Sequence, residues 1–298
     1  MPALTHQVPQ KLRNSNRIGR YEVVAKAGEG TSGIVYRAFD PALDREVAIK
    51  LARLESLDDD AVRHVAAEFR HEAKIAGKFA HENIVTIYDV VNKGRVIYLV
   101  MEFVPGRSLD DYMKATGRLD LAEALMITFR SCVGLAYIHY HGVIHRDIKP
   151  GNIMYHPAHR TVKLMDFSVA HSIEQPPSRD TGTIAYMAPE HFDPARRISQ
   201  LTDIFALGST LYRLLSGQYP FSREHTAFQI LHQEPAPIRA LRPDIPAPVA
   251  TLIERAMAKS DAERFQSAAQ FAREVEQVCR AVLPDAGVTD TTARYLAG

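Results

Sequence analysis

Residues 145–152 combine, in one short stretch, the side chains needed to move a phosphoryl group onto a hydroxyl. The stretch reads His-Arg-Asp-Ile-Lys-Pro-Gly-Asn, and it holds a carboxylate, a lysine suited to phosphate and an amide suited to a metal ion. Proline and glycine inside it exclude a continuous helix and predict a loop. Apolar runs at 143–144 and 153–155 predict that strands hold this loop.

A second motif at residues 28–35 reads Gly-Glu-Gly-Thr-Ser-Gly-Ile-Val, with the spacing G-x-G-x-x-G-x-V. Glycines let the backbone approach phosphates and turn its N–H groups toward anionic oxygens. Turns of this kind also join strands without any chemical role. This motif lies between two predicted strands, whereas a dinucleotide-binding fingerprint opens a helix. We therefore interpret it as a flap over the phosphates of ATP.

Lys50 ends the sequence Val-Ala-Ile-Lys on a strand that is otherwise suited to burial. A lysine at a strand end usually reaches water, but the nearby glycine motif favours contact with the α- and β-phosphates. The next predicted helix offers Glu68 and Glu72 as an anionic partner. At 100° per residue Glu72 falls beside the apolar stripe of that helix and Glu68 lies toward solvent. Glu72 is therefore the predicted partner of Lys50.

Composition sets the class of protein. The chain has 298 residues, 46% hydrophobic and 24% charged, with a net charge of +1, so no bias toward nucleic acid is visible. No uninterrupted apolar run reaches the roughly 18 residues of a membrane span. Residues 1–20 lack the apolar core of a secretory signal. Cys132 and Cys279 lie far apart and favour a reducing compartment. We expect a cytoplasmic protein that binds no nucleic acid and has no membrane span.

Hydrophobic periodicity predicts two parts. A flexible lead-in at 1–20 precedes strands at 21–25, 34–39, 46–51, 84–91 and 96–103, with one helix at about 58–77 and a hairpin turn at Asn92-Lys93-Gly94. Helices follow at 109–114, 121–141, 201–216, 227–233, 248–258 and 267–283. Residues 276–298 are the end of the last helix and a loose tail. This order predicts a small strand-rich lobe and a larger helical lobe.

Taken together, these motifs resemble a eukaryotic-type protein kinase over residues 21–275. They follow the order of that family: the glycine motif, Lys50, the 145–152 loop, Asp166-Phe167 and Ala188-Pro189-Glu190. The amino-acid sequences of these motifs are most similar to those of the bacterial, Hanks-type serine/threonine kinases. The resemblance implies an α+β, two-lobed kinase fold. Its N-lobe (21–103) is a small antiparallel sheet with one main helix, its hinge is 102–106, and its C-lobe (107–275) is larger and mainly helical.

The family's roles transfer residue by residue. Asp147 would accept or orient the proton of the substrate hydroxyl, Lys149 would lie near the γ-phosphate, and Asn152 and Asp166 would bind Mg²⁺, with Mn²⁺ as an alternative. A lysine two residues after the aspartate is typical of serine/threonine kinases. The implied catalytic set is Asp147, Lys149, Asn152, Lys50 and Glu72. The implied ATP-binding set is Ala27, Gly28, Glu29, Gly30, Thr31, Ser32, Gly33, Val35, Ala48, Lys50, Met101, Glu102 and Val104, with Met101 as gatekeeper and Val35 and Ala48 on either side of the adenine.

The resemblance also implies structural contacts. Asp203 would hold the backbone of the 145–152 loop, and Arg264 would pair with Glu190. His145 would pack under Phe167, so His139, His141 and His145 are not read as a metal cluster.

The segment between Asp166 and Glu190 carries the implied regulation. Arg146 and His171 would hold this activation segment once it is phosphorylated. Its candidate acceptors are Ser172, Ser178, Thr181 and Thr183. Thr183 matches a threonine that contacts Asp147 and Lys149, so we predict autophosphorylation at Thr181 or Ser178, with a transient homodimer for reaction in trans.

Ser168 departs from the family, which has glycine after Asp-Phe. A residue with a Cβ resists backbone angles that glycine tolerates, so Ser168 could misplace Asp166. The alternatives are then a pseudokinase-like nucleotide-binding scaffold and a small-molecule phosphotransferase. Because the charged groups are intact and the Ala-Pro-Glu segment resembles a peptide platform, an active protein serine/threonine kinase is the prediction. Whether the chain stands alone or is the catalytic part of a longer protein stays open.

Overall fold

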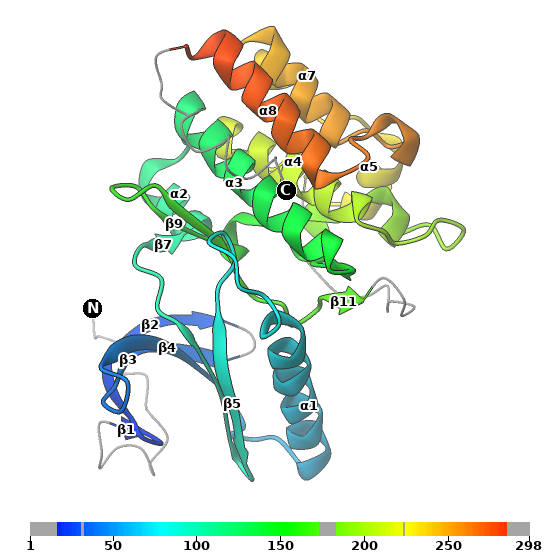
Figure 1. The fold of residues 1–298 in the computed structure, drawn as a ribbon. Helices are drawn as coiled ribbons and strands as arrows, with labels where there is room; N and C mark the ends of the chain where they lie inside the picture. The colour runs from blue at the N-terminus through cyan, green and yellow to red at the C-terminus, as the bar shows by residue number, and fades with distance from the viewer. Residues whose placement is uncertain (1–16, 31–32, 173–182, 223, 285–298) are drawn as a thin grey trace, which may run out of the picture. The chain divides into compact units, whose positions relative to one another are not determined.

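The computed structural model describes residues 17–30, 33–172, 183–222 and 224–284. Within these residues the chain forms two compact units, shown in Figure 1. Unit 1 holds the described residues up to Lys78 together with Thr86–Val104, and unit 2 holds Phe79–Val85 together with the described residues from Pro105 onward.

Unit 1 is built on a six-stranded antiparallel sheet in the order β1-β2-β3-β4-β6-β5. The strands are β1 (Arg17–Ile18), β2 (Tyr21–Gly30), β3 (Gly33–Asp40), β4 (Arg45–Leu51), β5 (Ile87–Lys93) and β6 (Val96–Glu102). Gly94, with a φ of 63°, makes the tight turn between β5 and β6. The antiparallel arrangement of β2–β6 is that predicted, but the hairpin turn lies at Gly94-Arg95 rather than at Asn92-Lys93-Gly94, because Asn92 and Lys93 still pair with Ile97 and Val96 of β6.

The one helix of unit 1, α1 (Asp59–Ala76), begins where the acidic run predicts. The side chain of Asp58 accepts a hydrogen bond from the Ala61 N–H (2.8 Å) and caps the helix. Alternation along β6 decides which face α1 covers, because Ile97 and Leu99 join the cluster of Phe69 on α1. The intervening Tyr98 and Val100 join a separate core on the sheet.

The N-terminal prediction needs a correction. Residues 17–20 are not part of a flexible lead-in, because Arg17 and Ile18 pair with Glu22 and Tyr21 of β2. Ile18 is only 2% exposed and belongs to the core of the sheet. Gly19, with a φ of 58°, makes the turn that folds this strand back.

The segment predicted as a strand from residue 84 also differs. β5 begins only at Ile87, and Phe79–Val85 belongs to unit 2 rather than to a lobe that runs unbroken over 21–103. The reason is a set of contacts with Leu164, whose N–H donates to Asn83 O (2.8 Å) and whose carbonyl accepts from Val85 N–H (2.9 Å). No local pattern indicates pairing with a partner so distant in sequence.

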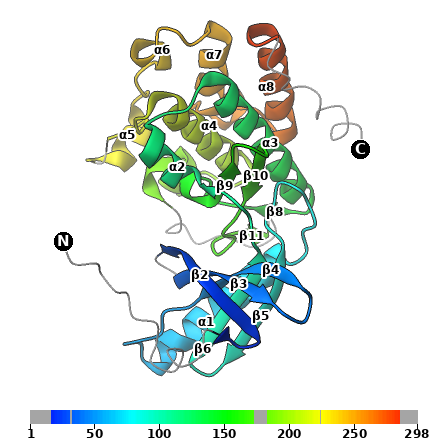
Figure 2. The ribbon, with the colours of Figure 1, turned by 90° about the vertical axis from the view of Figure 1, so that its left-hand side faces the viewer.

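Unit 2 is mainly helical, as predicted, and Figures 1 and 2 show α4 and α8 beside α3, with α7 packed against α4 and α8. Its helices are α2 (Leu109–Thr116), α3 (Leu121–Tyr140), α4 (Leu201–Ser216), α5 (Thr226–His232), α6 (Ile238–Leu241), α7 (Ala247–Ala256) and α8 (Ala268–Val282). Its strands are β7 (Arg107–Ser108), β8 (Val143–Ile144), β9 (Ile153–His156), β10 (Thr161–Leu164) and β11 (His171–Ser172). They form the sheets β10-β9-β7 and β11-β8.

α3 is the core helix of unit 2. It is buried on nearly all sides after its first turn, and it packs against α8, α4 and β10. Its length and apolar composition would also suit a membrane span, but 67% of that window is buried inside the protein. That burial is typical of a core helix.

Candidate active site

The loop 145–152 is held at its backbone by one buried carboxylate of α4. Asp203 accepts hydrogen bonds from the N–H of His145 (2.8 Å) and of Arg146 (2.7 Å). Arg146 has a φ of 70°, a conformation that is costly for a residue with a side chain. The two bonds to Asp203 offset that cost and hold the chain in the turn that presents Asp147. The contact implied for Asp203 is therefore present.

Asp203 stays charged although it is fully buried. Burial would raise its pKa, but the hydrogen bond and charge of His139, with the charge of His145 and the Arg146 N–H, hold the pKa below its ordinary value. His139 Nε2 lies 2.8 Å from Asp203 Oδ2. The contact between His139 and Asp203 was not among the contacts predicted from the sequence. The position of His139 six residues before His145 gave no local sign that both would meet α4.

Three donors surround the Asp147 carboxylate. Lys149 Nζ (2.6 Å) and Asn152 Nδ2 (2.8 Å) donate to Oδ2, and the Thr183 N–H donates to Oδ1 (3.0 Å). Lys149 also donates to the Thr183 hydroxyl (2.6 Å). A carboxylate offers about four acceptor sites, so one remains for a substrate hydroxyl. The structure thus brings together Asp147, Lys149, Asn152 and Thr183 as the motif implies.

The donor set beside this loop fits Mg²⁺. Asn152 turns its Nδ2 toward Asp147, and among the described residues no donor meets its Oδ1, which is left for a cation. Asp166 lies close by, because the N–H of Met165 donates to the carbonyl of Asn152 (3.0 Å). Amide and carboxylate oxygens are ligands that Mg²⁺ prefers, completed by phosphates and water. No cluster of three His, Cys, Asp or Glu side chains suited to a metal is found in the described ranges.

Ser168 causes no backbone strain. The left-handed residue of this segment is Asp166, with a φ of 62°, and Ser168 is not among the residues with a positive φ. Phe167 is fully buried, with its ring centroid 4.8 Å from that of His145 and 5.7 Å from that of Phe79. These ring contacts anchor the residue that follows Asp166. The pseudokinase-like alternative was based on backbone strain expected at Ser168, and the backbone shows no such strain at this residue.

Ser168→Gly is expected to change turnover by less than about threefold and to lower stability by roughly 0.5–1 kcal/mol. The first effect is small because Ser168 needs no left-handed conformation, and the second reflects the freedom that glycine gives the unfolded chain. Steady-state kinetics and denaturant unfolding measure the two effects. A rise in turnover of more than tenfold would show that serine holds Asp166 out of place.

In unit 1, Lys50 and Glu72 form a buried ion pair. Lys50 Nζ lies 2.9 Å from Glu72 Oε2, and both side chains are less than one-tenth exposed. The ammonium also lies over the ring of Phe69, 5.6 Å from its centroid. Glu68 is half exposed and lies beside His64 on the outer face of α1. The predicted choice of Glu72 over Glu68 is therefore present as a contact, while its role in catalysis stays a prediction.

Glu72→Gln is expected to lower kcat/KM for ATP by at least about tenfold, whereas Glu68→Gln should change it less than about twofold. The first variant removes the charge that Glu72 places beside the buried Lys50 ammonium, and the second removes only an exposed charge. The two substitutions are matched in chemistry and lie on one helix. A larger loss for Glu68→Gln would overturn the assignment.

The three glycines of residues 28–35 differ in what they allow. A Cβ on Gly33, with a φ of 155°, would lie 2.3 Å from the Leu51 carbonyl oxygen, so this position is glycine for packing reasons. Among the described residues, no atom lies within 4 Å of a Cβ built on Gly28 or Gly30. Space therefore remains beside these two for a ligand to approach the backbone. Thr31 and Ser32 lie outside the described residues.

The residues implied to meet adenine all lie on the sheet of unit 1 or directly after it. Val35 is on β3, Ala48 is on β4 opposite Met101 of β6, and Glu102 ends β6. The Glu102 N–H is engaged by the carbonyl of Thr86 (2.8 Å). Ala27 and Glu29 lie exposed on β2, and Val104 is buried. The structure places these residues on the elements predicted for them. Their contact with a nucleotide stays a prediction.

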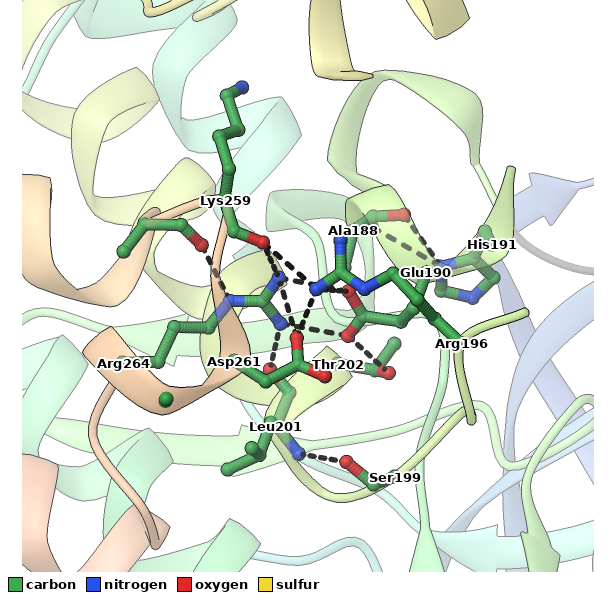
Figure 3. A network of polar contacts seen from close by, with 12 residues as sticks. Ala188, Glu190, His191, Arg196, Ser199, Leu201, Thr202, Lys259, Asp261 and Arg264 are labelled. Atoms are coloured by element: carbon green, nitrogen blue, oxygen red, sulfur yellow. Dashed lines mark hydrogen bonds and ion pairs between the residues drawn. The ribbon is translucent and has the colours of Figure 1, made fainter. Parts of the chain in front are cut away.

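Glu190 is the centre of a buried polar network in unit 2 (Figure 3). Arg264 donates to both of its oxygens, at 2.8 and 2.9 Å, and Thr202 donates to Oε1 (2.9 Å). Burial would raise the pKa of Glu190, but the bonds and charge of Arg264 outweigh it and hold the pKa below its ordinary value. The pair implied by the motifs is present. It fixes the segment after Thr183 against α4.

Arg196 is a member of this network that sequence analysis missed. Its Nη2 contacts Asp261, donates to the Lys259 carbonyl (2.8 Å) and lies 3.7 Å from Glu190 Oε2 (Figure 3). Asp261 lies 3.3 Å from Arg264 as well, so it joins the two arginines. Nothing in the local sequence marks Arg196, because its partners are far away along the chain.

The implied regulatory residues are described only in part. Arg146 is buried, which lowers the pKa of its guanidinium, and its Nη1 lies 3.5 Å from the Val169 carbonyl. His171 lies on β11, which pairs with β8 just before the loop. Ser178 and Thr181 lie outside the described residues, and phosphorylation at either one stays a prediction.

Comparison with known proteins identifies the family. The family model described as protein kinase domain matches residues 21–277. A probable serine/threonine-protein kinase of Corynebacterium efficiens is 36% identical over 278 residues, which cover 88% of this chain and 41% of that protein. PrkC of Bacillus subtilis is 34% identical, with 87% of this chain and 40% of that protein covered. PknA of Mycobacterium tuberculosis is 34% identical, with 87% of this chain and 61% of that protein covered.

The chain thus spans between 40% and 61% of the length of these relatives. The range that the family model matches includes the glycine motif, the 145–152 loop and the Glu190 network. The chain therefore belongs to the protein kinase family, and it is similar to the serine/threonine kinases of bacteria.

Proposed function

We propose that this protein transfers the γ-phosphoryl group of Mg-ATP to serine or threonine hydroxyls of protein substrates. The observation that carries the proposal is the Asp147 carboxylate, held by Lys149, Asn152 and Thr183 with one acceptor site left for a hydroxyl. Protein kinases generally use ATP with Mg²⁺, which supplies charge neutralisation at the phosphates when bound. Asn152 and Asp166 would hold the ion, and Lys50 would contact the phosphates.

The charges of the side chains indicate the role of each residue in the transfer. Asp147 orients the acceptor hydroxyl and takes its proton, and Lys149 places a positive charge beside the oxygens of the transferring group. Unit 1 contributes the Lys50–Glu72 pair and the open backbone at Gly28 and Gly30. Both cysteines are buried free thiols, which supports a reducing compartment such as the cytoplasm.

Incubation with γ-labelled Mg-ATP and a generic basic protein tests this function. Label on phosphoserine or phosphothreonine of the added protein is expected, and the Asp147→Asn variant provides the matched control. Labelling by neither form would refute turnover. We further propose autophosphorylation in trans through a transient homodimer, at Ser178 or Thr181. Mass spectrometry that finds both unmodified in active protein would remove this second step.

A further inference from the structure

A cavity of about 250 Å³ lies at the start of α3, outside the residues of phosphoryl transfer. It is lined by residues of α3, of the end of β9 and of the turn after it: Asp120, Ala122, Glu123, Met126, Tyr155, Pro157 and Arg160. All of them belong to unit 2. The lining combines two carboxylates and one guanidinium with the apolar surfaces of alanine, methionine, proline and a tyrosine ring.

Glu123 is fixed in place while one of its oxygens stays available. Tyr155 (2.6 Å) and Tyr112 (3.2 Å) both donate to its Oε1. Burial and the bond to Glu123 raise the pKa of Tyr155, so this hydroxyl keeps its proton and remains a donor. Among the described residues nothing donates to Oε2. The second carboxylate, that of Asp120, also has one engaged and one available oxygen. Its Oδ1 accepts from the Glu123 N–H (2.8 Å) and so caps α3, and its Oδ2 has no donor in the described ranges.

Arg160 faces the same cavity without closing it. It has a φ of 49° at the end of the β9–β10 turn, and in the described part of the chain its guanidinium contacts neither Asp120 nor Glu123. The carboxylates and the arginine therefore line one space without pairing. Two negative charges against one positive charge leave a net preference for a cation.

The shape and the apolar lining indicate what kind of cation fits. A guanidinium can meet Glu123 Oε2 and Asp120 Oδ2 together, because it presents several donors in one plane. Its aliphatic stem can lie on Met126 and the Tyr155 ring. Arg160 can donate to the backbone carbonyl beside such a side chain, and its charge disfavours an unbroken run of basic residues.

We propose that this cavity is a docking site for an arginine side chain of a protein substrate. Tyr155 lies three residues beyond Asn152 on the continuous chain into β9, about 10 Å away at the rise of a strand. One substrate chain could therefore place an arginine in the cavity and an acceptor hydroxyl near Asp147. The link to substrates rests on the proposed function, whereas the binding of arginine does not.

Binding is tested on the full chain with ¹³C-methyl methionine, using Met126 as the reporter and Met126→Leu to identify its signal. Nα-acetylarginine amide is the probe, and the neutral isostere Nα-acetylcitrulline amide is its control. A saturable shift with the arginine probe alone is expected. Asp120→Asn with Glu123→Gln should weaken it about tenfold, since charge-assisted bonds are lost. Asparagine still caps the helix and glutamine still accepts from both tyrosines, so the fold is retained. Equal shifts with citrulline, or no weakening in the variant, would overturn the site.

Substrate docking is tested by kinetics with the generic basic protein. The double variant should raise KM for that protein about fivefold to tenfold, leave kcat and KM for ATP unchanged, and lose its effect at high salt. Glu254→Gln, an exposed charge on α7, is the matched control and should change nothing. Arginine binding with an unchanged KM would overturn the substrate role alone. Absence of labelling by the parent would refute the proposed function, and the methyl signals would still decide whether the cavity binds arginine.

Discussion

Asp147→Asn is expected to lower the rate of phosphoryl transfer by a factor of roughly 100 to 10,000, the range that a positioned general base contributes. The amide cannot accept a proton at neutral pH. It also turns a donor toward groups that are donors themselves, because Lys149, Asn152 and the Thr183 N–H all converge on the two oxygens of Asp147. At least one of these bonds is lost, at a cost of about 1 kcal/mol.

Single-turnover labelling from Mg-ATP measures this loss, with ATP affinity determined separately. ATP affinity should change little, because Asp147 is implied to meet the acceptor rather than the nucleotide. Asp244→Asn removes an exposed carboxylate of the same unit and should retain the parent rate. Transfer at the parent rate by Asp147→Asn would exclude this residue as the base.

Arg264→Ala is expected to have the largest effect on stability, about 3–5 kcal/mol, the cost of leaving one partner of a buried pair uncompensated. Arg264 and Glu190 are both fully buried, and the guanidinium also donates to the carbonyls of Ala258 (2.7 Å) and Leu201 (3.1 Å). Denaturant unfolding measures the loss. The double variant Arg264→Met with Glu190→Gln should be less destabilised than Arg264→Ala, since the buried charge of Glu190 is removed together with that of its main partner.

The pH dependence gives this prediction a second readout. In the parent the pKa of Glu190 is held low, so the pair contributes its full stability above the ordinary carboxyl pKa and loses it as pH falls through the lowered value. Without Arg264, burial raises the pKa of Glu190, and the penalty of its charge disappears once the carboxyl is protonated. The difference between parent and Arg264→Ala should therefore shrink as pH falls. A difference that is constant with pH would show that the loss is one of packing.

Arg196 sharpens the same test. It lies 3.7 Å from Glu190 and can compensate part of the charge when Arg264 is absent. A double-mutant cycle should therefore show that Arg196→Ala costs more in the Arg264→Ala protein than in the parent. Equal costs would mean that the two arginines act independently.

The elements of the fold were largely predictable because their patterns are local. β6 is a continuous apolar run, and because side chains alternate along a strand, Ile97 and Leu99 join one core while Tyr98 and Val100 join another. The acidic run at Asp58 predicts the start of α1 for the same reason, since a cap acts within one turn. Where pairing depends on a distant partner, prediction failed. The strand of Ile18 is too short to show a period. Residues 84 and 85 have the pattern of a strand, although the contacts of Asn83 and Val85 with Leu164 take them into unit 2.

For the candidate site, the chemical groups and their order along the chain could be read from local sequence. The carboxylate, lysine and amide of 145–152 lie so close in sequence that any turn brings them together, and α1 directs Glu72 rather than Glu68 inward by its period alone. The contacts that hold these groups follow from the three-dimensional packing of the chain. His139 and the turn at Arg146 depend on Asp203, Arg196 depends on Asp261, and the strain expected at Ser168 lies instead at Asp166. These outcomes depend on charges and backbone angles set by residues far apart in sequence, which no local spacing encodes.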